Sequence, residues 1–224
     1  MSSTSNQPPG ARGFGADYWS EVYSTPGHVD GVGNAQAHAD YLRALFFLDT
    51  AYVGSIADFG FGLGHLLRAV TDVFSPQRVL GIEPSRYAFE QLSKADLHTT
   101  DRQVRLLQTD LLSWCLQPDD GFSFFDLGLC SSVLQYLSDD ELTQVVPILA
   151  KRLKWLYLTV PTDDSYAAMN AQSGFSDRFA TPRSAQTYHA LLRPHFDIVS
   201  SRLLESKRFA RGGDSPFSEA LFRC

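Results

Sequence analysis

Short apolar runs alternate with amphipathic stretches through the middle of the chain. The apolar runs predict strands at 55–59, 78–82, 104–108, 124–130 and 155–160. The stretches with apolar residues at helical spacing predict helices at 36–48, 64–74, 86–95 and 139–150. Because buried strands separated by helices are typical of βαβ units, the pattern predicts an α/β domain whose mostly parallel sheet has helices on both faces.

The two ends of the chain depart from this alternation. Residues 1–13 are rich in Ser, Pro and Gly and predict a disordered tail, and aromatic residues among glycines at 14–34 predict a flap. After Pro161 the pattern predicts a polar loop or short helix, then a helix, then two strands that suit an antiparallel pair, at 162–181, 182–192, 196–206 and 218–223.

We therefore expect one domain over residues 14–224. It divides into an N-terminal flap and helix (14–50), a cofactor-binding core (51–161), and a substrate insertion with closing strands (162–224). The chain of 224 residues, 44% of them apolar, is long enough to bury one full-size core.

Charge and cysteine content disfavour several kinds of partner. The net charge is −6, and duplex nucleic acid is disfavoured because phosphate binding needs clustered Lys and Arg. Neither a run of about 18 apolar residues nor a hydrophobic N-terminal segment occurs, so we expect a cytoplasmic protein with no membrane contact. Cys115, Cys130 and Cys224 lack the spacing of a zinc site or a disulfide framework, and we expect no metal.

The most informative segment is Asp58-Phe59-Gly60-Phe61-Gly62-Leu63-Gly64, between a predicted strand and a predicted helix. Glycine is needed where the backbone takes a positive φ or approaches a ligand closely. Such a turn before a helix presents free N–H groups to a nucleotide-like cofactor. Its spacing differs from the dinucleotide fingerprint G-x-G-x-x-G, and the leading acid would repel a pyrophosphate but suit a cationic or amine-bearing ligand. A plain structural loop is the alternative interpretation.

This segment resembles the first motif of the class I S-adenosylmethionine-dependent methyltransferases, an acidic residue followed by Gly-x-Gly-x-Gly. The resemblance implies S-adenosylmethionine as the cofactor and a Rossmann-like seven-stranded sheet whose last strand is antiparallel. It also implies that Asp58, Gly60, Gly62 and Gly64 line the amino-acid and ribose part of the cofactor.

A second element of the same family follows at Glu83, which ends the second predicted strand. In the family an acid at this position binds the ribose hydroxyls, as in other Rossmann-like sites. The resemblance assigns that role to Glu83 and places Pro84 and Ser85 beside the adenine. A solvated turn carboxylate is the competing interpretation of Glu83.

Two further elements continue the resemblance in the expected order. Asp110 and Leu111 match the family's adenine-binding positions, although Asp110 also suits a helix N-cap. Cys130 and Ser131 begin the segment Cys-Ser-Ser-Val-Leu-Gln-Tyr-Leu and would lie beside the methionine part of the cofactor. Tyr136, in the same segment, is a candidate for a catalytic role near the transfer site, and a packed aromatic residue is an equal alternative.

The methyl acceptor is nearly unmarked in the sequence. Transfer from a sulfonium depends on aligning the nucleophile and excluding water, and a general base is optional. Substrate residues in this fold come from the N-terminal segment, the turn after the fourth strand and the insertion after the fifth. Aromatic residues there suit an apolar, aromatic or peptidic acceptor under a lid, and the substrate candidates are Tyr18, Trp19, Tyr23 and Tyr166. Packing of Tyr18 and Trp19 on the first helix is the alternative.

Among the histidines, His28 in the flap is the second candidate for a catalytic role. His65 at the start of a predicted helix suits packing or capping near the cofactor. His189 and His195, in and after a late helix, suit surface positions.

Together these observations predict methyl transfer from S-adenosylmethionine to an O or N atom of a small-molecule acceptor, by a monomer or homodimer. The alternatives are a protein or peptide methyltransferase and a non-catalytic, cofactor-binding regulatory subunit. A nucleic-acid amino-methylase is disfavoured because Cys-Ser-Ser-Val stands where such enzymes carry Asn/Asp-Pro-Pro-Tyr/Phe. A nicotinamide dehydrogenase is disfavoured because the glycine spacing differs and no Tyr-x-x-x-Lys occurs.

Overall fold

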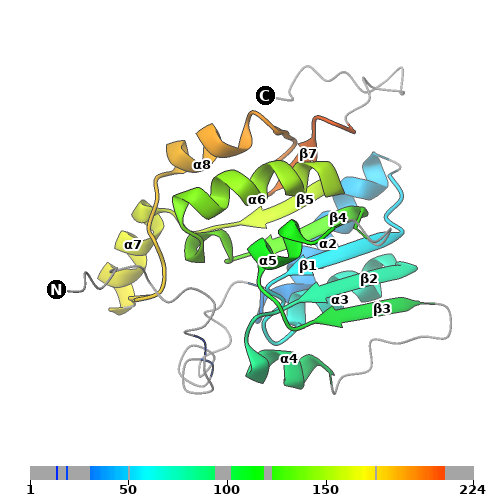
Figure 1. Cartoon of the computed structure of the whole chain (residues 1–224), viewed down its shortest axis with the longest axis horizontal. Coiled ribbons are helices and arrows are strands. Elements are labelled where there is room, and N and C mark those ends of the chain that lie inside the picture. The colour runs from blue at the N-terminus through cyan, green and yellow to red at the C-terminus, as the bar shows by residue number, and fades with distance from the viewer. Residues whose placement is uncertain are drawn as a thin grey trace.

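The computed structural model describes residues 14, 19, 31–49, 51–93, 102–118, 123–174 and 176–209. Within this part of the chain, one seven-stranded sheet runs in the order β3-β2-β1-β4-β5-β7-β6 (Figure 1). The five parallel strands are β1 (Ser55–Phe59), β2 (Arg78–Ile82), β3 (Gln103–Leu107), β4 (Phe125–Ser131) and β5 (Leu153–Thr159).

The sheet is completed by an antiparallel strand. β7 (Leu203–Ser206) pairs antiparallel with β5 on one side and with β6 (Phe196–Ile198) on the other. The seven-stranded sheet with its last strand antiparallel is therefore confirmed.

Helices cover both faces of the sheet. One hydrophobic core forms with the helices α2 (Ala35–Leu48), α3 (His65–Phe74) and α4 (Arg86–Ser93). The other forms with α5 (Leu111–Leu116), α6 (Asp139–Arg152) and α8 (Ala185–Leu192). The remaining helix of the described part, α7 (Asp163–Ser173), lies beyond the carboxyl end of β5 (Figure 1).

Alternation along the strands divides the apolar side chains between these two cores. In β1, Ile56 belongs to the core under α2 and α3, whereas Ala57 and Phe59 belong to the core under α5 and α6. In β5, Tyr157 and Leu156 divide in the same way. This two-residue period is the geometry of a strand buried on both sides. In β1 the middle of the strand is therefore closed to a ligand, and a ligand can approach at its end.

Polar side chains set several element boundaries. Ser138 caps α6, and with Glu141 it forms a reciprocal capping box. At the amino ends of the strands, Asp126 on β4 accepts from the backbone N–H groups of Gly54 and Ser55, both at 2.9 Å. Asp126 thereby joins β1 to β4 at the sheet edge opposite the glycine turn.

Two differences from the sequence prediction stand out, and a third stretch, expected as a polar loop or short helix, takes the helical alternative. The helix α5 was not predicted. The single strand expected at 196–206 is wrong: β6 and β7 are separated by a turn in which Ser200 Oγ accepts from Leu203 N at 3.2 Å. The polar stretch after Pro161 contains the regular helix α7, capped by Thr162.

Several predictions lie outside the described residues. These are the tail 1–13, most of the flap, the strand at 218–223, and the side chains of Tyr18, Tyr23 and His28. Among the described helices, none combines the length and the apolar character needed to cross a bilayer.

Candidate functional site

The predicted cofactor residues gather at the carboxyl end of the sheet. The strand order β2-β1-β4 places the segment after β1 between the ends of β2 and β4. From β1 the chain runs outward on one side through β2 to β3, and it then crosses to the other side of β1 for β4 and β5. The direction of the strand order therefore reverses at β1. Such a switch point is where open α/β sheets bind ligands.

The glycine turn uses backbone conformations that favour glycine. Gly60, Gly62 and Gly64 have φ values of 77°, 55° and 78°. A Cβ atom on Gly60 would lie 2.6 Å from Cγ2 of Val133, and one on Gly64 would lie 2.4 Å from Cδ1 of Leu92. The turn is therefore set by left-handed backbone and by close packing, and other side chains would be strained there.

Glu83 links the end of β2 to this turn. Its Oε2 accepts from Gly62 N at 2.9 Å, and its Oε1 accepts from Ser85 N at 2.9 Å. The residue is only 2% exposed, so the alternative of a solvated turn carboxylate is wrong. Each carboxylate oxygen can accept a further hydrogen bond, which leaves room for a ligand hydroxyl.

Asp58 lies beside Glu83 and is equally buried. Burial, and secondarily the charge of Glu83, raises the pKa of Asp58 to about 8. Burial also raises the pKa of Glu83 to about 7, against the lowering effect of its bonds from Ser85 and Gly62. Asp58 Oδ2 has no hydrogen-bond partner among the described residues. Two buried acids with an unpartnered oxygen fit a ligand that brings positive charge and N–H donors.

Asp110 and Leu111 begin α5. Asp110 is the N-cap: its Oδ1 accepts from Ser113 N and its Oδ2 from Ser113 Oγ, both at 2.8 Å. The N-cap interpretation is thus confirmed, and an adenine-binding role for Asp110 stays a prediction. Leu111 is buried in the core under α5.

Cys130 and Ser131 end β4. Cys130 is fully buried, and burial, followed by the nearby charge of Asp58, raises its thiol pKa far above the ordinary value. The thiol is therefore unreactive. Ser131 Oγ lies 2.8 Å from Thr159 Oγ1 at the end of β5.

Ser85 connects the cofactor side to the N-terminal segment. Its Oγ accepts from Trp19 Nε1 at 2.7 Å and donates to the carbonyl oxygen of Phe14 at 3.0 Å. Trp19 is 7% exposed. Pro84, before Ser85, is partly buried. The indole N–H therefore bonds to the residue that follows the Glu83 turn.

Tyr136 occupies an aromatic cluster next to this connection. The ring of Phe14 meets the rings of Tyr136 and Phe179 edge-on, with centroids 4.8 Å and 5.6 Å apart. The Tyr136 hydroxyl donates to Asp177 Oδ2 at 2.8 Å. Residues from the N-terminal segment, the turn after β4 and the insertion after β5 thus meet here. Tyr166, the described substrate candidate of the insertion, is partly buried on α7.

The histidines add no base to the described site. His65 is exposed at the start of α3, where burial and then Arg68 lower its pKa. His189 is exposed on α8, and His195 is partly buried after it. Among the described residues, no group of three His, Cys, Asp or Glu side chains could hold a metal ion.

Sequence reasoning missed three residues of this region: Asp177, Phe179 and Arg183. Asp177 accepts the hydrogen bond of the Tyr136 hydroxyl, and the ring of Phe179 packs against that of Phe14. Arg183 donates to a backbone carbonyl of the turn around Tyr136. No local pattern marks them, because each acquires its partner only when the insertion folds back onto the turn after β4.

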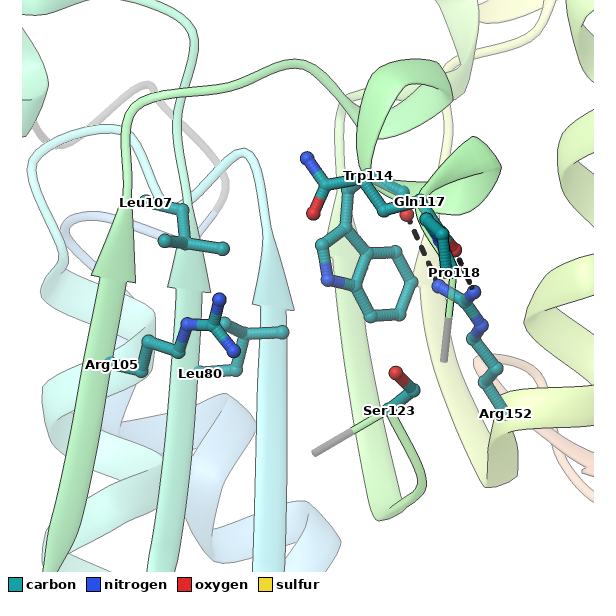
Figure 2. A pocket seen from close by; sticks show the side chains of 8 residues that line it. All are labelled: Leu80, Arg105, Leu107, Trp114, Gln117, Pro118, Ser123 and Arg152. Carbon is teal, nitrogen blue, oxygen red and sulfur yellow. Dashed lines mark hydrogen bonds between the residues drawn. The ribbon is translucent and has the colours of Figure 1, made fainter. Parts of the chain in front are cut away.

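A separate recess lies on the α5 face of the sheet. Figure 2 shows Arg105 and Leu107 on β3 and Leu80 on β2 facing Trp114, with Arg152 bonded to the carbonyl oxygens of Trp114 and Gln117. None of the predicted site residues lines this recess. It is therefore distinct from the glycine-turn site.

Comparison with known proteins agrees with this geometry. Residues 56–155 match the family model described as "Methyltransferase domain". This range begins in β1 and ends in β5, so it contains the glycine turn, Glu83 and the turn after β4. No curated protein is significantly similar to the chain in sequence.

Solved structures share the fold at low sequence identity. The magnesium protoporphyrin IX methyltransferase of Synechocystis PCC 6803, with bound SAH, is 18% identical (TM-score 0.58; 85% of this chain and 92% of that one). The plantazolicin methyltransferase BpumL in complex with SAH is 16% identical (TM-score 0.61; 91% and 79%). An S-adenosylmethionine-dependent methyltransferase of Clostridium acetobutylicum is 11% identical (TM-score 0.62; 85% and 98%).

The sheet order and the site at its switch point define a class I methyltransferase fold. A methyltransferase domain therefore matches residues 56–155, and the fold around it is that of S-adenosylmethionine-dependent methyltransferases.

Gly60→Ala tests whether close packing, beyond backbone strain, shapes the glycine turn. Gly174 is the matched control because its φ is 69° but nothing lies within 4 Å of an added Cβ. We expect Gly174→Ala to cost about 1 kcal/mol of unfolding free energy, and Gly60→Ala about 1–3 kcal/mol more, since the new methyl must displace Val133. Urea titrations measure both values, and equal costs would contradict the packing argument.

The buried acids predict a pH dependence of stability. Both pKa values are raised by folding, so the native state holds more protons than the unfolded state between about pH 4 and pH 8. The free energy of unfolding of the ligand-free protein should therefore lose this contribution progressively as pH rises through that window. Asp58→Asn removes the Asp58 share, and we expect the variant to gain stability relative to wild type toward pH 8.

Thermal unfolding at a series of pH values measures this difference between variant and wild type. Glu90→Gln, an exposed carboxylate on α4, is the control. A constant difference between Asp58→Asn and wild type across the window would contradict the assignment.

Proposed function

We propose that the protein transfers the methyl group of S-adenosylmethionine to an O or N atom of a small molecule. The observation that carries this proposal is the pair of buried acids at the glycine turn, with Asp58 Oδ2 left without a hydrogen-bond partner in the described part of the chain. A pyrophosphate would be repelled there, whereas a ligand with cationic groups and a ribose diol supplies what the pair lacks.

The roles of the cofactor residues follow from their positions. Asp58 would accept from the cofactor's amino group, and the free lone pairs of Glu83 from the ribose hydroxyls. Gly60, Gly62 and Gly64 allow the ligand to approach the backbone without a Cβ in the way. Their left-handed turn leads directly into α3, whose N-terminus offers backbone N–H groups and a positive dipole end to acceptor atoms or negative groups of the ligand.

Pro84, Ser85, Asp110, Leu111, Cys130 and Ser131 are proposed as further cofactor contacts from their places around this turn. Ser85 and Asp110 follow the ends of β2 and β3, next to the predicted adenine position. Cys130 and Ser131 end β4, next to the predicted methionine position. The neutral Cys130 thiol would contribute packing and no nucleophile.

When bound, the cofactor supplies an electrophilic methyl group on a positively charged sulfur. A lone pair of the acceptor O or N forms the new bond to that methyl carbon, and the carbon–sulfur electron pair returns to sulfur. The acceptor loses its proton to solvent or to a nearby base. The protein's task is alignment of the acceptor and exclusion of water.

The aromatic cluster of Phe14, Tyr136 and Phe179 supports an apolar, planar acceptor. It joins the N-terminal segment, the turn after β4 and the insertion, and Trp19 extends it toward Ser85. The structural neighbours include methyltransferases named for magnesium protoporphyrin IX and plantazolicin. A protein or peptide is the alternative acceptor.

Tyr136 is proposed to orient or deprotonate the acceptor. Its hydroxyl donates to Asp177 at 2.8 Å, which fixes the place of a phenol group that can both donate and accept hydrogen bonds. This arrangement places a polar atom at the rim of an otherwise apolar cluster.

S-adenosylhomocysteine is expected to bind the purified protein with a micromolar dissociation constant. Glu83→Ala should weaken that binding by about 1–3 kcal/mol, because charge-assisted hydrogen bonds to the ribose are lost. Glu90→Ala on the exposed face of α4 is the control. Isothermal titration calorimetry measures all three proteins. A folded wild-type protein without binding heat would overturn the cofactor assignment, and an unchanged affinity of Glu83→Ala would remove Glu83 from the ribose role.

Labelled-methyl transfer to fractionated metabolites and peptides tests the acceptor class. We expect label in planar, apolar small molecules, and a reduction of about tenfold or more in turnover for Tyr136→Phe with S-adenosylhomocysteine affinity unchanged. Label confined to peptides would replace the small-molecule assignment. Full turnover by Tyr136→Phe would remove Tyr136 from the reaction.

A further inference from the structure

Arg183 is a charged residue buried beside the turn after β4. Its side chain is 5% exposed, and a guanidinium in such a place must find acceptors for its donors. Its Nη2 donates to the carbonyl oxygen of Leu137 at 2.6 Å, and its Nη1 to that of Leu134 at 3.5 Å. These carbonyls flank Tyr136, so one guanidinium holds both ends of the short 3₁₀ turn that carries it.

The same side chain reaches two further segments. Arg183 Nη1 donates to Thr181 O at 3.4 Å, and Nε donates to Asp139 Oδ1 at 2.7 Å at the start of α6. The backbone repeats the connection, since Thr181 N donates to Gln135 O at 2.8 Å and Asp163 N donates to Arg183 O at 2.9 Å. The insertion is therefore attached to the turn through Arg183 and its immediate neighbours.

The turn held in this way touches both halves of the site. Val133 at its start fills the space that a Cβ on Gly60 would occupy, so the turn packs against the glycine turn. Tyr136 at its end packs against Phe14 and bonds to Asp177. A displacement of the turn would change the distance between the cofactor side and the acceptor side.

We propose that Arg183 is a positioning residue for methyl transfer, which sets the place of Tyr136 relative to the glycine turn. Its catalytic consequence rests on the proposed function, whereas the position of Tyr136 is measurable without an acceptor. The carbonyl bonds matter more than the ion pair, because Asp139 is 83% exposed and water screens it. Lys cannot replace Arg here, since only the planar fork of donors reaches several carbonyls at once.

Arg183→Lys tests the proposal, with Arg152→Lys as the matched control. Arg152 also donates to two backbone carbonyls, Trp114 O at 3.1 Å and Gln117 O at 2.7 Å, but these lie at α5 in the recess of Figure 2. Each variant carries 3-fluorotyrosine at position 136, and fluorine NMR reports the surroundings of that ring. We expect a shifted or broadened signal in Arg183→Lys alone, with S-adenosylhomocysteine affinity within about twofold of wild type, since the residues assigned to the cofactor are untouched.

Kinetics separate positioning from mere support of the fold. With an acceptor from the labelled-methyl experiment, Arg183→Lys should lower kcat/KM for the acceptor by about tenfold or more and leave KM for S-adenosylmethionine unchanged. A wild-type fluorine signal in Arg183→Lys would overturn the proposal. The proposal would also be overturned if acceptor turnover and cofactor affinity fell only in proportion to the fraction of folded protein.

Failure of the proposed function has a different signature. Absence of S-adenosylhomocysteine binding in wild type would overturn the function, and the fluorine comparison would still decide the place of Tyr136. If Arg183→Lys does not fold, Arg183→Gln replaces it in the same comparison. The planar amide of Gln keeps two N–H donors without the charge.

Discussion

A single buried carboxylate organises the candidate site of this protein. Glu83 accepts the backbone N–H groups of Gly62 and Ser85, and so ties the glycine turn after β1 to the segment after β2. This arrangement places a carboxylate where little water can solvate its negative charge, which is energetically unfavourable. The second buried acid, Asp58, adds to this unfavourable energy. A ligand that brings positive charge and hydrogen-bond donors relieves that cost. The same constraint explains why the site favours a sulfonium cofactor over a pyrophosphate.

Around this carboxylate, the two sides of the site are formed by different parts of the chain, one mainly by backbone and the other by side chains. The cofactor side is built from backbone: left-handed glycines, strand ends and the N–H groups that Glu83 holds. The proposed acceptor side is built from side chains that come from distant segments, among them Phe14, Tyr136 and Phe179. The two sides meet where Val133 packs on Gly60 and where Ser85 bonds to Trp19. A shared backbone site with a variable set of side chains suits a fold that serves many acceptors.

The sequence predicted the parts of the fold whose signals are local. The strands β1 and β2 occupy the predicted residues 55–59 and 78–82, because each is a short apolar run between turn residues. α5 was missed because it has only six residues, almost all apolar, and shows no helical period. The strand expected at 196–206 failed because three consecutive polar residues, Ser200-Ser201-Arg202, interrupt it and form the turn that separates β6 from β7.

The sequence by itself determined the βαβ alternation, the positive-φ glycine turn and the acid at the end of β2, because backbone sterics and side-chain period act between neighbouring residues. The tertiary structure alone decided that Asp58 Oδ2 lacks a partner, and that Trp19 reaches Ser85, 66 residues away. It also decided that Arg183 bonds to carbonyls 46 and 49 residues before it. Such contacts form only after the sheet brings remote segments together, and no pattern of adjacent residues specifies them.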